Sequence, residues 1–208
     1  LGPLGYTHCC IEDLSIMRSL PNITVISPAD SFETLKAVEA ALQHPTSVYI
    51  RITGSNNNPI IYKNDYKFII GKTVTLMEGD DICIFTTGAI SSEALKAAEL
   101  LKEEKISCKV INVHTIKPLD SNEIFNHIKN KKMIFSLEEH NKIGGLGSAI
   151  SDIISSQNKS IKLIKFAIND RYDKGGDYQY LKEKNGLTAN QILKNIINEF
   201  KLVDTTVG

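Results

Sequence analysis

The order of apolar and polar residues along the chain predicts two blocks in which β-strands alternate with α-helices. Short runs rich in β-branched residues are typical of buried strands, whereas apolar residues that recur every three to four positions are typical of helices. The first block predicts a helix that begins near Ile11, a strand at 23–27, a helix at 32–43 and a strand at 47–52. The helix at 32–43 has an apolar face made of Leu35, Val38, Ala41 and Leu42.

The second block follows the turn-forming stretch Gly54-Ser55-Asn56-Asn57-Asn58-Pro59. It opens with two strands, 68–77 and 82–86, and the short sequence between them predicts a hairpin-like connection. The other expected elements are helices at 91–101, 121–128, 146–154 and 189–200 and strands at 108–113, 133–137 and 161–167. Strands that alternate with helices of about ten residues form βαβ units, so we expect an α/β fold with a mostly parallel sheet and helices on both faces.

Composition narrows the classes of function. The 208 residues are 42% hydrophobic, and this is enough apolar material for one or two cores. The 24 basic residues balance the 24 acidic residues and are interspersed with them, so nothing favours binding to nucleic acid or to a membrane surface. No apolar run is long enough to span a bilayer. A soluble protein in a reducing, cytoplasmic setting is therefore the default expectation.

The four cysteines do not predict a metal site. Cys83 and Cys108 lie within apolar strands and are expected to be buried as small hydrophobic residues. Cys9 and Cys10 are adjacent, which is not the spacing of a zinc site, and no second pair of ligands lies near them in the sequence. We therefore expect no metal ligand in this chain.

A glycine-rich turn, Gly144-Gly145-Leu146-Gly147, lies between a predicted strand and a predicted helix. A helix N-terminus that follows glycines can bind phosphate, but the spacing here is not that of a dinucleotide-binding fingerprint. A tight turn that lets another backbone approach closely is the simpler interpretation. His140 stands just before this turn, beside Glu138 and Glu139, where it could titrate near neutral pH. His44, His114 and His127 are expected to be structural or exposed.

Two residues are better candidates for chemistry. His8 follows the turn Gly5-Tyr6-Thr7 and precedes the first helix, so its side chain is expected to face solvent or a ligand. Arg51 lies at the C-terminal end of the strand 47–52, where ligand-binding residues of open α/β sheets collect. A turn residue and a surface arginine remain the alternatives.

The Gly5–His8 motif, the run from Leu20 to Asp30 and the strand that ends at Arg51 together resemble the pyrimidine-binding domain of thiamine-diphosphate transketolases. The segment 137–149 is similar to the corresponding turn of the transketolase C-terminal domain, which in the family packs near the dimer interface. The likeness is strongest to the separately encoded C-terminal transketolase subunit and more distant to deoxyxylulose-phosphate synthase. It extends from about Gly5 to about Phe200.

This resemblance implies a division of the chain into parts. Residues 1–58 would be the C-terminal part of the pyrimidine-binding domain, 59–66 a connector, 67–203 the transketolase C-terminal domain and 204–208 a tail. The chain begins within a motif, so we expect it to be part of a longer enzyme. That enzyme would be a transferase of carbohydrate metabolism that moves two-carbon ketol units between sugar phosphates.

The resemblance also implies roles for three residues. His8 would project into the cofactor cleft as the catalytic imidazole, able to exchange protons and to donate to a developing oxyanion. Arg51 would bind the substrate phosphate through its planar guanidinium. Leu4 stands where the family commonly has an aspartate that binds a sugar hydroxyl. Leucine cannot accept that hydrogen bond, and this makes an unusual sugar or acceptor a plausible substrate.

Cofactors and partners follow from the same resemblance. Thiamine diphosphate and Mg²⁺ would serve the full enzyme, and the residues that hold them are expected outside this chain, which alone should bind neither. The expected partner is an N-terminal transketolase subunit that carries the diphosphate-binding domain, with self-association through the C-terminal domain to give a heterotetramer. Two alternatives remain open: an enzyme similar to deoxyxylulose-phosphate synthase that uses pyruvate, and a non-catalytic dimerisation module.

Overall fold

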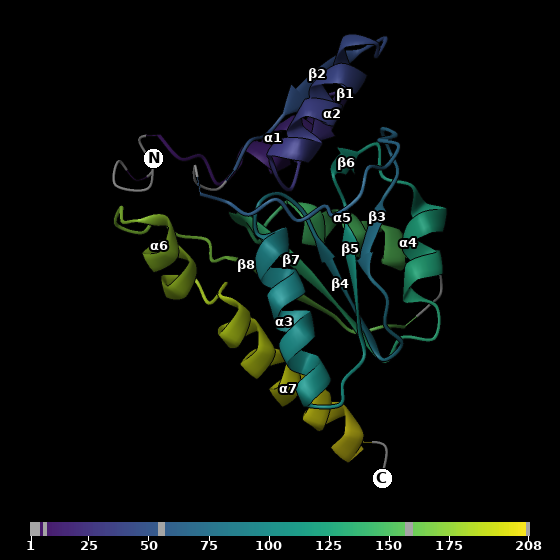
Figure 1. Cartoon of the computed structure of the whole chain (residues 1–208), viewed down its shortest axis with the longest axis vertical. Helices are drawn as coiled ribbons and strands as arrows, with labels where there is room; N and C mark the ends of the chain where they lie inside the picture. Colours follow the sequence, from purple (N-terminus) through teal and green to yellow (C-terminus); the bar gives the residue numbers. More distant parts are fainter. Residues whose placement is uncertain (1–4, 6–7, 54–56, 157–159, 207–208) are drawn as a thin grey trace.

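The computed structural model describes residues 5, 8–53, 57–156 and 160–206, which form an α/β fold with two sheets (Figure 1). The smaller sheet has three strands in the order β2-β1-β6. Strand β1 (Ile23–Ile26) is parallel to β2 (Ser47–Ile50) and antiparallel to β6 (Thr115–Lys117). Because β6 belongs by sequence to the second block, the two blocks share a sheet as well as a covalent connection.

Two helices accompany this sheet, α1 (Asp13–Ser19) and α2 (Ser31–Leu42). Asp30 caps α2, since its Oδ1 atom accepts a hydrogen bond from the Glu33 backbone N–H at 2.8 Å. The apolar face of α2 was expected to be buried, but the helix is oriented with most of this face toward solvent. Ala37 and Glu33 are buried, whereas the face that carries the larger apolar side chains is exposed, with 67% exposure at Leu35, 43% at Val38 and 82% at Leu42. Glu33 takes the inward position because its carboxylate receives hydrogen bonds there, as described in the Discussion.

The larger sheet has five strands in the order β3-β5-β4-β7-β8. Its strands are β3 (Val74–Met77), β4 (Ile82–Thr86), β5 (Cys108–Asn112), β7 (Met133–Asn141) and β8 (Leu163–Ile168). The strands β5, β4, β7 and β8 are mutually parallel, and only β3 at the edge runs antiparallel. The mostly parallel sheet that the sequence predicted is therefore confirmed.

The predicted hairpin between 68–77 and 82–86 is wrong. Strand β3 pairs with β5 and not with β4, and its regular part begins only at Val74. Strand β4 is buried along its whole length because parallel neighbours flank it on both sides. The connection passes close to the start of β5, where a Cβ atom on Gly79 would lie 2.3 Å from the Cys108 carbonyl carbon.

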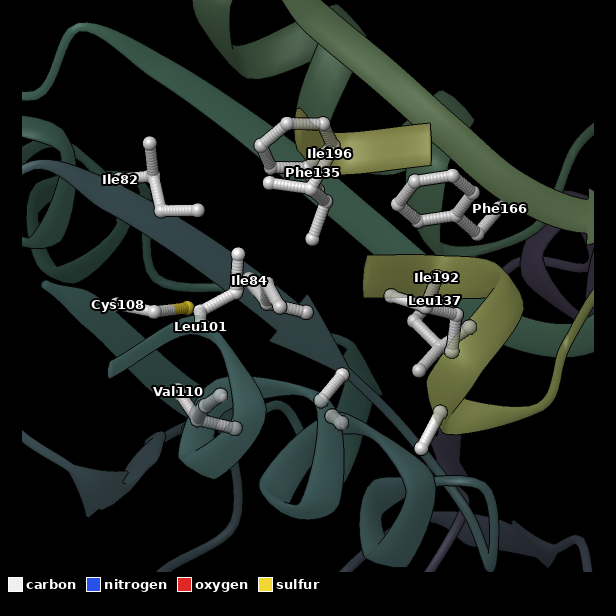
Figure 2. Close-up of a cluster of buried hydrophobic side chains, with 14 of the residues drawn as sticks. Ile82, Ile84, Leu101, Cys108, Val110, Phe135, Leu137, Phe166, Ile192 and Ile196 are labelled. Atoms are coloured by element: carbon white, nitrogen blue, oxygen red, sulfur yellow. The ribbon is translucent and has the colours of Figure 1, made fainter. Parts of the chain in front are cut away.

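Helices cover both faces of the larger sheet, as predicted. On one face α3 (Ser91–Glu103) and α7 (Ala189–Thr206) lie side by side, and their apolar residues pack with those of the sheet (Figure 2). On the other face α4 (Ser121–Ile128) and α5 (Leu146–Ser155) pack against β4 and β7. Burying one large apolar side chain contributes about 1.5–3 kcal/mol, so these two clusters account for much of the stability.

Among its described residues, the first block forms no separate hydrophobic cluster. Leu14 of α1 and Val25 of β1 belong to the same buried cluster as Phe85 and Ile150 of the larger sheet and its helix. A short helix that the sequence pattern did not predict, α6 (Tyr178–Lys184), follows β8. None of the helices in the described part of the chain is long and apolar enough to cross a membrane.

Candidate active site

A cavity of about 430 Å³ lies where the two blocks meet. The segment before α1, the end of β2, the end of β7 and helix α6 all contribute to its walls. Both described candidates from the sequence, His8 and Arg51, line it. The volume is within the range of cavities that bind small molecules. The fold therefore brings together two residues that stand 43 positions apart in the sequence.

Arg51 follows β2 and is held by several contacts. Its Nε atom donates to the Asp13 carboxylate, at 3.0 Å to Oδ1 and 2.8 Å to Oδ2. Its Nη2 atom donates to the backbone oxygens of Glu139 at 2.8 Å and Cys10 at 3.3 Å. The Arg51 and Asp13 side chains are only 8% and 10% exposed. Nη1 is the guanidinium nitrogen that these contacts leave for another partner.

The Asp13 carboxylate also binds Tyr49, whose hydroxyl donates to Oδ2 at 3.0 Å. Burial, together with the charge of Asp13, raises the pKa of Tyr49 to about 12. Tyr49 therefore remains a neutral hydrogen-bond donor at physiological pH. The pair Asp13 and Arg51 joins α1, β2 and the end of β7 at the wall of the cavity.

His8 lies in the segment that precedes α1, five residues before the helix begins at Asp13. Its side chain is exposed, and its backbone N–H donates to the Gly5 oxygen at 3.0 Å. Gly5 has φ +58°, a left-handed conformation that glycine adopts without strain. His8 lines the cavity with an exposed side chain, and its role in catalysis stays a prediction. Leu4 lies outside the described residues.

The cysteines behave as two separate pairs. Cys83 and Cys108 are buried, as predicted, and burial raises the pKa of both thiols, for Cys108 to about 12. Cys9 and Cys10 line the cavity, and desolvation raises the pKa of the Cys10 thiol, which donates to Glu12 Oε2 at 3.2 Å. Within the described part of the chain, no group of three or more His, Cys, Asp and Glu side chains could hold a metal ion.

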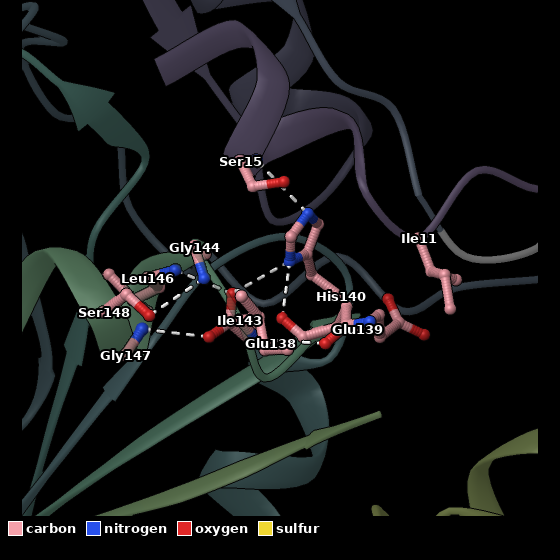
Figure 3. Close-up of polar contacts among 12 residues, drawn as sticks. Ile11, Ser15, Glu138, Glu139, His140, Ile143, Gly144, Leu146, Gly147 and Ser148 are labelled. Carbon is pink, nitrogen blue, oxygen red and sulfur yellow. Dashed lines mark hydrogen bonds and ion pairs between the residues drawn. The ribbon is translucent and has the colours of Figure 1, made fainter. Parts of the chain in front are cut away.

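Strand β7 runs beyond the predicted end at residue 137 and includes Glu138, Glu139 and His140 (Figure 3), of which only Glu139 lines the cavity. Side chains alternate along a strand, so Glu138 and Glu139 point in opposite directions. Glu138 points to the glycine turn, where it accepts hydrogen bonds from the backbone N–H groups of Leu146 at 2.7 Å and Gly147 at 2.9 Å. Burial is the main reason that the pKa of Glu138 is raised to about 7.

The glycine turn therefore has no room for a nucleotide phosphate. The Glu138 carboxylate already occupies the N-terminus of α5, and a Cβ atom on Gly145 would lie 2.0 Å from Glu138 Oε2. Gly144 has φ +78°, and a Cβ atom there would lie 2.3 Å from the Ser15 Cβ atom of α1. The interpretation as a tight turn that permits close approach of another segment is confirmed.

His140 shares this side of β7 and does not line the cavity. Its Nδ1 atom donates to the Asn141 oxygen at 2.7 Å, and its Nε2 atom lies 3.4 Å from the Ser15 backbone N–H that donates to it. Burial lowers the pKa of His140, which favours this neutral form. The hypothesis that His140 titrates near neutral pH as a catalytic group is thus not supported. Its contacts fix α1 against the end of β7.

The other histidines are structural, as expected. His44 contacts the Thr24 hydroxyl at 3.0 Å and His127 contacts the Thr73 hydroxyl at 2.9 Å. His114 is buried, bonds the Thr115 hydroxyl at 2.8 Å and stacks on Phe68. None of the three lines the cavity.

The cavity also contains charged residues that the sequence analysis did not select. These are Lys174, Lys182, Asp13, Glu139 and Asp177, which together with Arg51 give the lining three basic and three acidic side chains besides His8. Alternation beyond the buried run of β7 was the one signal that could have indicated Glu139. Nothing in the local pattern indicated that the segment before α6 would fold back to this place.

Comparison with known proteins identifies the family. Residues 71–192 match the model of the transketolase C-terminal domain, and residues 1–59 match that of the transketolase pyrimidine-binding domain. The chain belongs to the transketolase family. A protein of Methanocaldococcus jannaschii described as a putative transketolase C-terminal section is 37% identical over 97% of this chain and 63% of its own length. The 6-deoxy-6-sulfo-D-fructose transketolase subunit SqwH of Clostridium sp. (strain MSTE9) is 38% identical over 91% of this chain and 58% of its own length.

A solved structure supports the same placement. A split gene transketolase, described as an inactive beta4 tetramer, aligns with a TM-score of 0.83 and 34% identity over 92% of this chain and 62% of that chain. The chain thus spans about three fifths of the length of these relatives. In this transketolase family member, the cavity lies at the boundary between the two matched domains.

Proposed function

We propose that this chain is the C-terminal part of a thiamine-diphosphate-dependent transketolase that transfers two-carbon ketol units between sugar phosphates. The observation that carries the proposal is the cavity that both His8 and Arg51 line, in a chain that belongs to the transketolase family. We further propose that the chain is active only with the upstream part of the enzyme or with an N-terminal partner subunit, in the cytoplasm.

Each candidate residue has a distinct task in this proposal. The His8 imidazole exchanges a proton with the substrate oxygen next to the reacting carbon, and as a donor it stabilises negative charge that develops there. Arg51 binds the substrate phosphate. Because Asp13 and two backbone oxygens already hold Nε and Nη2, the contact falls to Nη1. The same contacts fix the guanidinium in one orientation, so little conformational entropy is lost when phosphate binds.

The described residues do not fit the diphosphate and Mg²⁺ end of the cofactor. The helix N-terminus that could have received a phosphate is filled by Glu138, and the described part of the chain contains no cluster of metal ligands. Thiamine diphosphate supplies the carbanion chemistry when bound, and we place its binding groups in the partner or upstream part. This chain alone should therefore show no measurable affinity for thiamine diphosphate and Mg²⁺ in calorimetric titration.

The assembly that we propose is a dimer of heterodimers, with self-association of this subunit through its C-terminal domain. The description of the solved relative as a beta4 tetramer supports self-association of such subunits. The relative named for 6-deoxy-6-sulfo-D-fructose supports a sugar-derived substrate other than the ordinary ketose phosphates. Leu4, at the position of the family's aspartate, is the residue that we propose determines this preference, and Leu4→Asp should shift it toward ordinary ketose phosphates.

The test is steady-state kinetics of the complex reconstituted from the full-length subunits. His8→Ala should lower kcat by about 10²–10⁴-fold, the usual contribution of a general acid–base group. Arg51→Lys should raise KM for phosphorylated sugars, with a loss of about 1.5–3 kcal/mol for a hydrogen bond to a charged group. His44→Ala changes a histidine that does not line the cavity, so it is the matched control and should leave both constants unchanged.

Three outcomes would change the assignment. Near-normal kcat for His8→Ala would make His8 a turn residue only. Decarboxylation of pyruvate by the unaltered complex would favour the alternative similar to deoxyxylulose-phosphate synthase. Complete absence of thiamine-dependent activity in the reconstituted complex would favour the non-catalytic dimerisation module.

A further inference from the structure

Glu139 is one of the three acidic residues of the cavity lining, and it belongs to the C-terminal domain. It lies near the end of β7 with its backbone oxygen fixed by Arg51 Nη2 at 2.8 Å. Figure 3 shows its carboxylate on the side of β7 opposite to Glu138, toward Ile11, another residue of the cavity lining. The strand and the arginine thus hold the Glu139 side chain beside the proposed phosphate-binding residue.

The Glu139 carboxylate is incompletely satisfied. Its Oε2 atom is buried and accepts no hydrogen bond within the described residues. Burial raises the pKa of the carboxyl group, an effect that the nearby hydroxyls of Tyr178 and Thr53 and the charge of Arg51 partly offset. A buried acceptor without a partner costs free energy, and a donor that enters the cavity would recover it.

Two of the three cations that line the cavity with Glu139 are paired with other carboxylates. Lys182 Nζ pairs with Glu93 Oε1 at 2.8 Å, and the Arg51 guanidinium pairs with Asp13. The neighbouring Glu138, by contrast, has both carboxylate oxygens bonded to backbone N–H groups of α5. Of the two adjacent carboxylates, Glu139 is therefore the one with an acceptor atom left for a ligand.

The charge of the cavity indicates the kind of donor. The three basic side chains of the lining balance the three acidic ones, so the cavity as a whole does not select a cationic ligand. An anionic group would be repelled by Glu139 and drawn toward Lys174, a lining residue for which no ion pair is found among the described residues. A neutral hydroxyl group fits beside Glu139, because an O–H donor completes the buried acceptor without adding charge.

We propose that Glu139 is a specificity-determining residue of the cavity, and that its carboxylate accepts a hydrogen bond from one hydroxyl group of a polyhydroxylated phosphate substrate. The phosphate lies at the Arg51 and Lys174 side and the hydroxyl chain extends toward β7. This inference rests on the proposed function for the class of substrate, and it adds a determinant from the C-terminal domain to the residues of the pyrimidine-binding domain.

The test measures binding without turnover. The reconstituted complex is titrated calorimetrically with a five-carbon ketose phosphate and with the series of its monodeoxy analogues. Glu139→Ala should weaken binding of the parent sugar by about 10- to 100-fold, the range for a hydrogen bond to a charged group. For one monodeoxy analogue the unaltered complex and Glu139→Ala should bind equally well, because the hydroxyl that Glu139 contacts is already missing.

Two further variants keep the test decisive. Glu139→Gln preserves the shape and one acceptor oxygen and should give a smaller loss with the same dependence on the analogue. Glu183→Ala removes an exposed carboxylate of α6 that does not line the cavity, and it should change nothing. Equal binding by Glu139→Ala and the unaltered complex for every sugar, or an equal loss for every analogue, would overturn the proposal.

The two proposals fail separately. If the unaltered complex binds these sugars with the predicted dependence on Glu139 but transfers no ketol unit, the proposed activity is wrong and the role of Glu139 stands. If it transfers ketol units but the analogue series is insensitive to Glu139→Ala and Glu139→Gln, only the role of Glu139 is wrong.

Discussion

Glu33 and Glu139 both have carboxylates held away from water. They differ in how many hydrogen-bond donors surround each carboxylate. Glu33 lies in a connector cluster that we define as Glu33, Tyr62, Tyr66 and Asn112. Its Oε1 atom accepts from the Tyr62 and Tyr66 hydroxyls, its Oε2 atom accepts from the Ala29 backbone N–H, and Asn112 Nδ2 lies 2.9 Å from both oxygens. Glu139, at the cavity, has one oxygen without such a partner.

This difference separates a structural carboxylate from one suited to a ligand. The donors to Glu33 come from three segments of the chain: the residues just before α2, the connector and β5. Asp30 adds a further contact, since its Oδ2 atom accepts from the Ile61 backbone N–H at 2.7 Å. Complete satisfaction offsets the cost of burial and fixes the arrangement of the two blocks. Because one oxygen of Glu139 lacks a hydrogen-bond donor, a ligand that enters the cavity can gain binding energy by donating to it.

The largest effect is expected when the connector cluster is broken. Glu33→Ala leaves several buried donors without an acceptor, and it should lower the free energy of unfolding by about 3 kcal/mol. Urea denaturation of the chain is the measurement. Glu39→Ala, an exposed glutamate of the same helix, is the matched control and should change stability by less than about 0.5 kcal/mol. Similar small values for both variants would contradict the structural role of Glu33.

A pH-dependent effect of intermediate size is expected from His114, which stacks on Phe68, a residue that follows the connector. Burial lowers the pKa of His114 to about 3, below the ordinary value of 6.5. Between pH 6.5 and about 3 the unfolded chain therefore binds more protons than the folded one, and stability falls as the pH falls. The slope from this residue approaches about 1.4 kcal/mol per pH unit.

His114→Asn removes the titrating group while it keeps a hydrogen-bonding side chain. The difference in unfolding free energy between the unaltered chain and His114→Asn, measured by urea denaturation from pH 7 to pH 4.5, should shrink as the pH falls. A difference that stays constant over this range would show that His114 titrates alike in the folded and unfolded chains.

The smallest effect on stability is expected at Glu139. Removing a buried carboxylate with an unpartnered oxygen removes its desolvation cost together with its contacts, so Glu139→Ala should change the free energy of unfolding by less than about 1 kcal/mol. Urea denaturation of Glu139→Ala, measured in parallel with Glu33→Ala, compares the loss of stability at the two carboxylates directly. A loss as large as that of Glu33→Ala would mean that Glu139, too, is mainly structural.

The site was only partly predictable. The motif around His8 and the strand end at Arg51 indicated both residues, because a glycine turn and the end of a strand are local features. Asp13, which holds Arg51, and Glu139, which faces it, were not selected, because their positions depend on how α1 and β7 approach each other. His140 was a candidate from the sequence, but its hydrogen-bond partner Ser15 lies 125 residues away, so its structural contact could not be seen in the local pattern.

The sequence by itself determined the alternation of strands and helices and the mostly parallel sheet, because the periods of apolar residues are local and repeat within each element. Only the tertiary structure decided the partner of β3, the entry of β6 into the smaller sheet and the outward turn of the apolar face of α2. Each of these depends on contacts between distant segments. For α2, bonds from Tyr62, Tyr66 and Asn112 to Glu33 turned a charged residue inward, which no pattern within the helix could show.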